Sequence, residues 1–84
     1  MDINVKKREG EVEPWSYDKL VASIGKAGVP EREAEQVAGA VQSWVLTNAE
    51  SGVVSSTAVR DKVIEEMKKS YPSEADTYQA YKKG

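Results

Sequence analysis

The sequence predicts an α+β fold that is mainly helical, with a small three-stranded β lid over a cluster of four helices. Three observations lead to this prediction. Polar and apolar residues alternate on both sides of Gly10, which is typical of a β-hairpin. Four later segments repeat apolar residues at helical spacing. A short β-prone segment, Val53–Ser55, can add a third strand to the hairpin. With 84 residues, the chain is expected to form a single domain over residues 1–84.

The hairpin is the first predicted element. Two short strands, residues 2–6 and 11–13, flank a turn at residues 8–10, where Gly10 can adopt a positive φ. Pro14 ends the second strand because it cannot donate a backbone hydrogen bond. An isolated hairpin is marginally stable in water, so it must pack on the helices.

The first two helices are predicted from their ends and their apolar faces. Ser16 is a good N-cap for the first helix, and Gly28 stops it. Pro30 takes the first position of the second helix, which runs to about Thr47. The expected buried faces are Tyr17, Leu20, Val21, Ile24 and Ala27 in the first helix, and Ala34, Val37, Ala38, Val41, Trp44 and Val45 in the second.

The last two helices follow the β-prone segment. Ser56 or Thr57 is expected to cap the third helix, and Ser73 with Asp76 has the spacing of a capping box for the fourth. The buried positions are expected to be Val59, Val63, Ile64, Met67 and Tyr71 in the third helix, with Tyr78 and Tyr81 sharing one face of the fourth.

Composition argues against several classes of function. The chain has no cysteine and no histidine, which excludes disulfide scaffolds, zinc ribbons and the usual general base. The net charge of −2 indicates neither nucleic acid nor an anionic membrane as a partner. No apolar run is long enough for a membrane span or a signal peptide, so a cytoplasmic location is expected. With no Walker motif, catalytic carboxylate pair or protein-built metal site visible, we expect no enzyme, no catalytic residue and no metal ligand.

The most informative segment runs from Val5 to Lys19. Strand alternation places Lys7 on the face of Val5, with Lys6 and Arg8 on the other face, and a turn at Arg8 can bring it beside Lys7. These two cations then converge with Lys19 at a helix N-terminus, whose free N–H groups bind phosphate oxygens. A nucleoside triphosphate is therefore a plausible ligand. On composition alone, a solvated edge strand that uses lysine to avoid aggregation is the favoured alternative.

The motifs in this segment resemble the opening of the ATP-cone domain. They are a basic strand, the run Lys7-Arg8-Glu9-Gly10, the run Glu13-Pro14-Trp15, and a helix start at Lys19-Leu20. The ATP-cone is a nucleotide-sensing module at the front of ribonucleotide reductase large subunits, and it also occurs in the transcriptional repressor of ribonucleotide reductase genes. The order of the predicted elements fits the family's three-stranded sheet over four helices, and the resemblance covers nearly the whole chain.

This resemblance implies an effector site for ATP or dATP, with or without Mg²⁺. It implies that Lys7, Arg8 and Lys19 meet phosphates, that Val5 approaches the base or ribose, and that Ser56 contacts the nucleotide from the other side. Lys6 stands where the family often has an apolar or β-branched residue. The full set of candidate nucleotide-binding residues is Val5, Lys6, Lys7, Arg8, Glu13, Ser16, Lys19 and Ser56.

The sequence thus favours an allosteric module that binds ATP or dATP and controls ribonucleotide reductase or another protein partner, with self-association as one route. Two alternatives stay open. A DNA-linked transcriptional regulator is disfavoured by the net charge of −2 and by the lack of a recognisable DNA-reading module, so nucleic acid is not an expected partner. A helical protein-interaction module without nucleotide binding is disfavoured by Lys7, Arg8 and Lys19 occurring together. Trp15 and Trp44 are interpreted as core residues.

Overall fold

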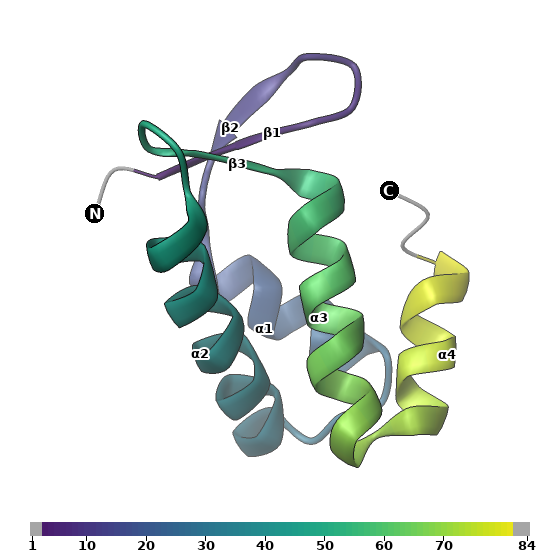
Figure 1. The fold of residues 1–84 in the computed structure, drawn as a ribbon. Helices are drawn as coiled ribbons and strands as arrows, with labels where there is room; N and C mark the ends of the chain where they lie inside the picture. Colours follow the sequence, from purple (N-terminus) through teal and green to yellow (C-terminus); the bar gives the residue numbers. More distant parts are fainter. Residues whose placement is uncertain (1–2, 82–84) are drawn as a thin grey trace.

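The computed structural model describes residues 3–81, which form a small sheet across one end of a helix cluster (Figure 1). The fold is α+β and mainly α, as predicted, and α4 packs beside α3. The elements are β1 (Asn4–Lys6), β2 (Val12–Pro14), α1 (Tyr17–Lys26), α2 (Glu31–Asn48), β3 (Val53–Ser55), α3 (Ser56–Ser70) and α4 (Pro72–Tyr81).

The sheet has the strand order β2-β1-β3, so β1 is its central strand. β1 pairs with β2 antiparallel and with β3 parallel, which places Val5 opposite both Glu13 and Val54. The hairpin turn closes where predicted, because Gly10 has a φ of 94° and its N–H donates to the Lys7 carbonyl at 2.9 Å. The predicted third strand, Val53–Ser55, is therefore confirmed, and it joins the hairpin through β1.

The core lies between the helices and the inner face of the sheet, and it confirms the predicted apolar faces. α1, α2 and α3 supply its largest fully buried side chains, while the sheet region adds Ile3 and Val54 and α4 adds Ala75 and Tyr78. Four residues of the predicted faces are only partly buried and pack against this core: Tyr17, Val21, Trp44 and Tyr71. The side chain of Tyr81 lies outside the described residues. The largest fully buried side chains are Ile24, Met67, Val41, Val45 and Val63.

The start of α1 agrees with the sequence prediction, whereas the start of α3 does not. Ser16 is the N-cap of α1, and its Oγ accepts a hydrogen bond from the Lys19 N–H at 3.2 Å. The N-cap of α3 is Ser55, so the prediction of Ser56 or Thr57 was wrong. Ser55 keeps the extended backbone of β3, and its Oγ accepts from the Ala58 N–H at 3.4 Å. Ser56 is consequently the first helical residue, and its hydroxyl is not used for capping.

The starts of α2 and α4, which both involve a proline, also differ from the prediction. Pro30 is the N-cap of α2, one position before the expected place, because its ψ of 148° is not helical. α4 begins at Pro72, whose missing N–H is harmless at the first helical position. Ser73 therefore lies inside the helix, and the predicted capping box with Asp76 was wrong.

Candidate functional site

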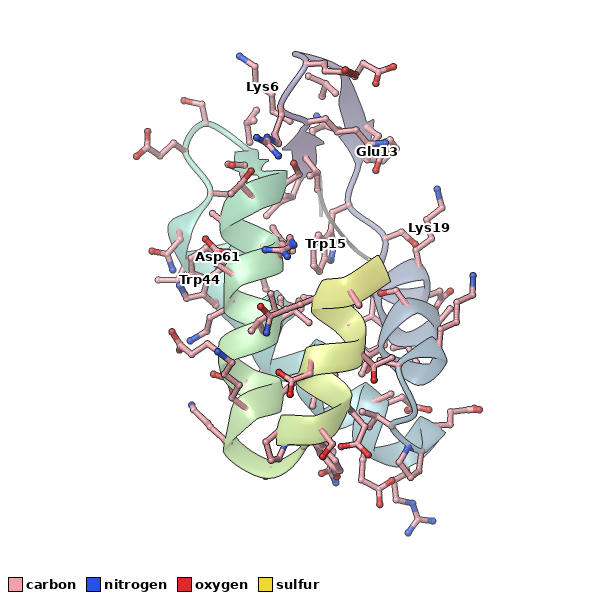
Figure 2. All side chains as sticks on the ribbon, turned by 90° about the vertical axis from the view of Figure 1, so that its right-hand side faces the viewer. Lys6, Glu13, Trp15, Lys19, Trp44 and Asp61 are labelled. Atoms are coloured by element: carbon pink, nitrogen blue, oxygen red, sulfur yellow. The ribbon has the colours of Figure 1, made fainter. Side chains whose placement is uncertain are left out.

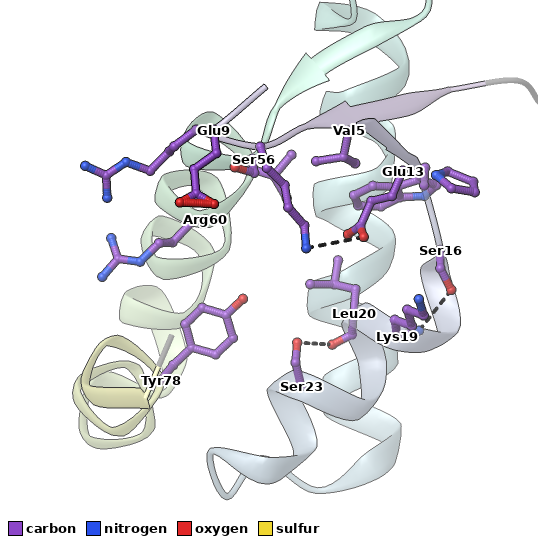
Figure 3. A pocket seen from close by; sticks show the side chains of 15 residues that line it. Val5, Glu9, Glu13, Ser16, Lys19, Leu20, Ser23, Ser56, Arg60 and Tyr78 are labelled. Atoms are coloured by element: carbon purple, nitrogen blue, oxygen red, sulfur yellow. Dashed lines mark hydrogen bonds and ion pairs between the residues drawn. The ribbon is translucent and has the colours of Figure 1, made fainter. Parts of the chain in front are cut away.

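A cavity of about 690 Å³ lies between the hairpin and the helices (Figure 3). Its volume falls within the usual range for small-molecule sites, about 300–1,000 Å³. The sheet, the junction before α1, and the helices α1, α3 and α4 all contribute to its walls. The lining residues are Val5, Lys7, Arg8, Glu9, Glu13, Pro14, Trp15, Ser16, Lys19, Leu20, Ser23, Ser56, Val59, Arg60 and Tyr78.

The structure brings seven of the eight sequence-predicted site residues together around this cavity. The exception is Lys6, which is exposed and extends away from the helices (Figure 2). Strand alternation explains the difference, because Val5 and Lys7 share the face that points toward the cavity and Lys6 points to the other face. Arg8 lies in the turn, where the alternation ends, and it also lines the cavity.

The charged residues of the cavity have a positive surplus. Lys7, Arg8, Lys19 and Arg60 face two carboxylates, those of Glu9 and Glu13, giving four formal positive charges against two negative ones. A concave site with this balance attracts anions more strongly than a flat surface would.

One of these cations already has an anionic partner. Lys7 Nζ lies 3.4 Å from Glu13 Oε2, and the two side chains are 47% and 45% exposed. Such a half-exposed ion pair is weak, about 0.2–1 kcal/mol, because water screens it. A phosphate group could therefore compete with Glu13 for Lys7.

The N-terminus of α1 lies at the same cavity. Ser16 lines the cavity and caps the helix, and Lys19 follows it by one turn. The helix dipole places partial positive charge at this end, which adds to the charge of the side chains. Anionic ligands would therefore meet both the cationic side chains and the positive end of a helix.

Two residues that the sequence analysis did not select, Arg60 and Tyr78, complete the far wall. Arg60 follows Ser56 by four positions on α3, and this spacing could have identified it once Ser56 was a candidate. Arg60 Nη1 also lies 3.7 Å from Asp61 Oδ1. Tyr78 comes from α4, and no local sequence signal indicates which of its residues reaches the cavity.

Tyr78 is almost fully buried, with 4% of its surface exposed, and its hydroxyl points toward the cavity (Figure 3). Burial raises the pKa of the Tyr78 phenol, while a hydrogen bond with Ser23 and the nearby charge of Arg60 act in the opposite direction. The phenol therefore stays protonated near neutral pH and presents a neutral hydroxyl beside the cations.

Trp15 is part of the cavity wall as well as part of the core, whereas the sequence analysis interpreted it as a core residue alone. Its ring packs against the core and also lines the cavity. Its Nε1 donates to Gln42 Oε1 at 2.8 Å, which ties the junction between β2 and α1 to α2. Trp44 does not line the cavity. The two tryptophans therefore differ in their expected response to a ligand.

Two features are absent from residues 3–81. No group of three or more histidine, cysteine, aspartate or glutamate side chains is placed to hold a metal ion there. In the same residues, no helix combines the length and the apolar character needed to cross a membrane.

Comparison with known proteins gives two findings. A family model described as the ATP cone domain matches residues 3–83, which include every residue that lines the cavity. The chain is also 34% identical over 74 residues to the transcriptional repressor NrdR of Persephonella marina. That alignment covers 83% of this chain and 48% of the relative, so the chain spans about half the length of the relative.

Proposed function

The chain belongs to the ATP-cone family, and we propose that it is a regulatory module that binds ATP or dATP in the cavity between the hairpin and the helices α1, α3 and α4. The observation that supports this best is that four cationic side chains line one cavity, which Ser16, the N-cap of α1, also lines. They come from the hairpin, α1 and α3, so a triphosphate bound among them would link separate parts of the fold.

Each wall of the cavity has a role in this proposal. Lys7, Arg8 and Lys19 hold phosphate oxygens by charge-assisted hydrogen bonds, and Arg60 adds a further cation opposite them. Apolar surface around Val5 accommodates the base or the ribose. The remaining predicted residues contribute polar groups: Glu13 accepts hydrogen bonds from ribose hydroxyls or the base amine, and the Ser16 and Ser56 hydroxyls contact the nucleotide from opposite sides.

Mg²⁺ would enter this site with the nucleotide. The described residues offer no cluster of three ligating side chains, and Mg²⁺ commonly keeps several waters while binding phosphates. Glu9 and Glu13 are the carboxylates near enough to the cavity to take part in such a shell, directly or through water. The ion would then add positive charge for the phosphate oxygens, and no catalytic role is assigned to any residue.

Tryptophan fluorescence tests nucleotide binding directly. ATP, dATP and GTP are titrated into the protein, and we expect saturable quenching or shift with ATP and dATP, and a weaker response with GTP. Trp15→Phe should abolish most of the signal because Trp15 lines the cavity, whereas Trp44→Phe should preserve it. Calorimetric titration of both variants separates loss of signal from loss of binding. If wild-type protein binds none of the three nucleotides, the proposal is wrong.

We further propose that the nucleotide controls ribonucleotide reductase or another protein partner, either directly or through self-association. Binding energy can shift such an equilibrium only if the nucleotide prefers one of the packing states. Sedimentation velocity of the ligand-free, ATP and dATP forms, alone and with a candidate reductase, should reveal a change in mass or shape. Tight binding with identical sedimentation in every form and mixture would contradict the regulatory part of the proposal.

A second candidate function is the nucleotide-sensing part of a transcriptional regulator, favoured by the similarity to a protein named as a transcriptional repressor. Fluorescence anisotropy of labelled duplex DNA from a ribonucleotide reductase promoter, with and without ATP or dATP, tests it. Sequence-dependent binding that the nucleotide alters would support this candidate, and anisotropy that is unchanged under all conditions would contradict it for this chain.

A further inference from the structure

A second cavity, of about 640 Å³, lies between α1 and the start of α2. We call this cavity the α1–α2 groove. Its lining includes Asp18, Val21, Gly25, Val29, Glu31 and Glu35. Its lining contains apolar residues and three carboxylates but no lysine or arginine. The charge of this groove is therefore opposite to the surplus in the nucleotide cavity.

The three carboxylates have no cationic partner within the described part of the chain. Asp18 and Glu31 lie in the first turns of α1 and α2, where the helix dipole stabilises negative charge. Glu35 lies beyond the first turn of α2, so the dipole does not account for it. Its position one turn after Glu31 puts both carboxylates on the same side of the helix.

Gly25 is a second, independent feature of the groove. It lies in the last turn of α1 without a positive φ, and a Cβ built on it would meet no atom of another element within 4 Å. Neither a positive φ nor steric crowding within this chain therefore requires glycine at this position. Ala22, one turn earlier, also lines the groove. Small residues one turn apart allow another backbone to approach α1 closely.

We propose that the α1–α2 groove is a docking surface for a helix of a partner protein that carries two basic residues four positions apart. Such residues match the spacing of Glu31 and Glu35, and their aliphatic stems can lie on Val21 and Val29 while their charged heads reach the carboxylates. This inference goes beyond the proposed nucleotide site and does not depend on it.

The sequence itself argues for a different protein rather than a second copy of this chain. No two lysine or arginine residues in the 84-residue sequence are three or four positions apart. None of its own helices therefore presents the pair of basic residues that the groove matches.

A peptide titration tests the proposal. The probe is an alanine-rich helical peptide with two arginines four positions apart, and its twin has glutamines in their place. Amide chemical shifts of the isotope-labelled chain should change around the groove with the arginine peptide, and the glutamine twin should bind about fivefold more weakly. Glu31→Gln with Glu35→Gln should lower the affinity by about the same factor.

Two further variants distinguish binding of the peptide at the groove from general electrostatic attraction to an acidic protein. Glu11→Gln with Asp76→Asn removes the same charge from exposed positions outside the groove and should leave the affinity unchanged. Gly25→Leu fills the groove without changing charge and should abolish binding; if it fails to fold, the paired glutamine variants decide. The proposal is overturned by no shifts at the groove, by equal effects of the two charge-removing double variants, or by self-association that the groove variant abolishes. ATP titration of the same variants is a separate readout of the nucleotide site.

Discussion

Removing the Lys7 side chain is the most informative perturbation of the proposed nucleotide site. Lys7 lines the cavity but is paired with Glu13 at 3.4 Å, whereas Arg8 takes part in no ion pair among residues 3–81. A charge-assisted hydrogen bond to phosphate contributes about 1.5–3 kcal/mol. If the phosphate displaces Glu13, about 0.2–1 kcal/mol of ion pairing is lost on binding, because that pair is half exposed.

The gain from the phosphate hydrogen bond, less the cost of any ion pair that is lost, predicts how much each substitution weakens ATP binding. Lys7→Ala should weaken ATP binding by about 0.5–2.8 kcal/mol, centred near 1.6 kcal/mol or about fifteenfold in Kd. Arg8→Ala breaks no ion pair and should cost the full range, about 1.5–3 kcal/mol, so its loss of affinity should be the larger. The expected order of affinity is therefore wild type, then Lys7→Ala, then Arg8→Ala.

Isothermal titration calorimetry with ATP measures these affinities, and circular dichroism checks that each variant keeps its helices. Lys68→Ala is the matched control, since Lys68 is an exposed cation in the last turn of α3 and does not line the cavity. ATP binding by Lys7→Ala and Arg8→Ala that equals wild type would refute the assignment of the site. An affinity lost equally in Lys68→Ala would point to general electrostatic attraction instead.

Three other predictions concern stability and chemistry. Ile24→Ala truncates a fully buried side chain and should lower the free energy of unfolding by about 2–5 kcal/mol in urea titration; a loss below about 1 kcal/mol would contradict the described core. Hydrogen bonds from Lys69 and Lys62 lower the pKa of Glu66 below its ordinary 4.5, so their contribution is present above that pH and is lost as pH falls through the folded-state pKa. Glu66→Gln should thus destabilise the protein at pH 7, and this effect should shrink as pH falls below 4.5; an effect that does not change with pH would exclude this account. Incubation with ATP and Mg²⁺ should release no phosphate above a protein-free blank, because no residue of the site is assigned to activate water.

The sequence predicts those parts of the fold that depend on local chemistry. Gly10 permits a turn that few other residues allow, and Ser16 followed by an apolar period marks a helix start. The start of α3 was less predictable because Ser55, Ser56 and Thr57 are all good N-caps. Pairing of β3 with β1 decides between them, since Ser55 must still be extended to reach Lys6 in the register. Such a long-range contact is not visible in a local pattern.

In the candidate site too, local sequence predicts some of the residues, and only long-range packing decides the others. Lys7, Arg8 and Lys19 are close in sequence, so a hairpin followed by a helix is enough to predict that they line one cavity. Arg60 and Tyr78 reach the cavity only because α3 and α4 pack where they do, and tertiary packing sets that position. Lys6 shows that a basic residue type is not enough to predict a place in the site. It belongs to the same basic run as Lys7 and Arg8, but strand alternation turns it away from the cavity.

α1 is the wall that the two proposed surfaces share. Ser16 and Lys19 face the nucleotide cavity, while Asp18 and Gly25 of the same helix face the α1–α2 groove. A ligand that fixes the first turn of α1 through Ser16 and Lys19 would also fix Asp18, which lies between them in sequence. Any resulting coupling must be reciprocal, because a nucleotide that changes the affinity for a partner has its own affinity changed by the same factor. The packing of α1 would then connect nucleotide binding to a partner surface without requiring a large conformational change.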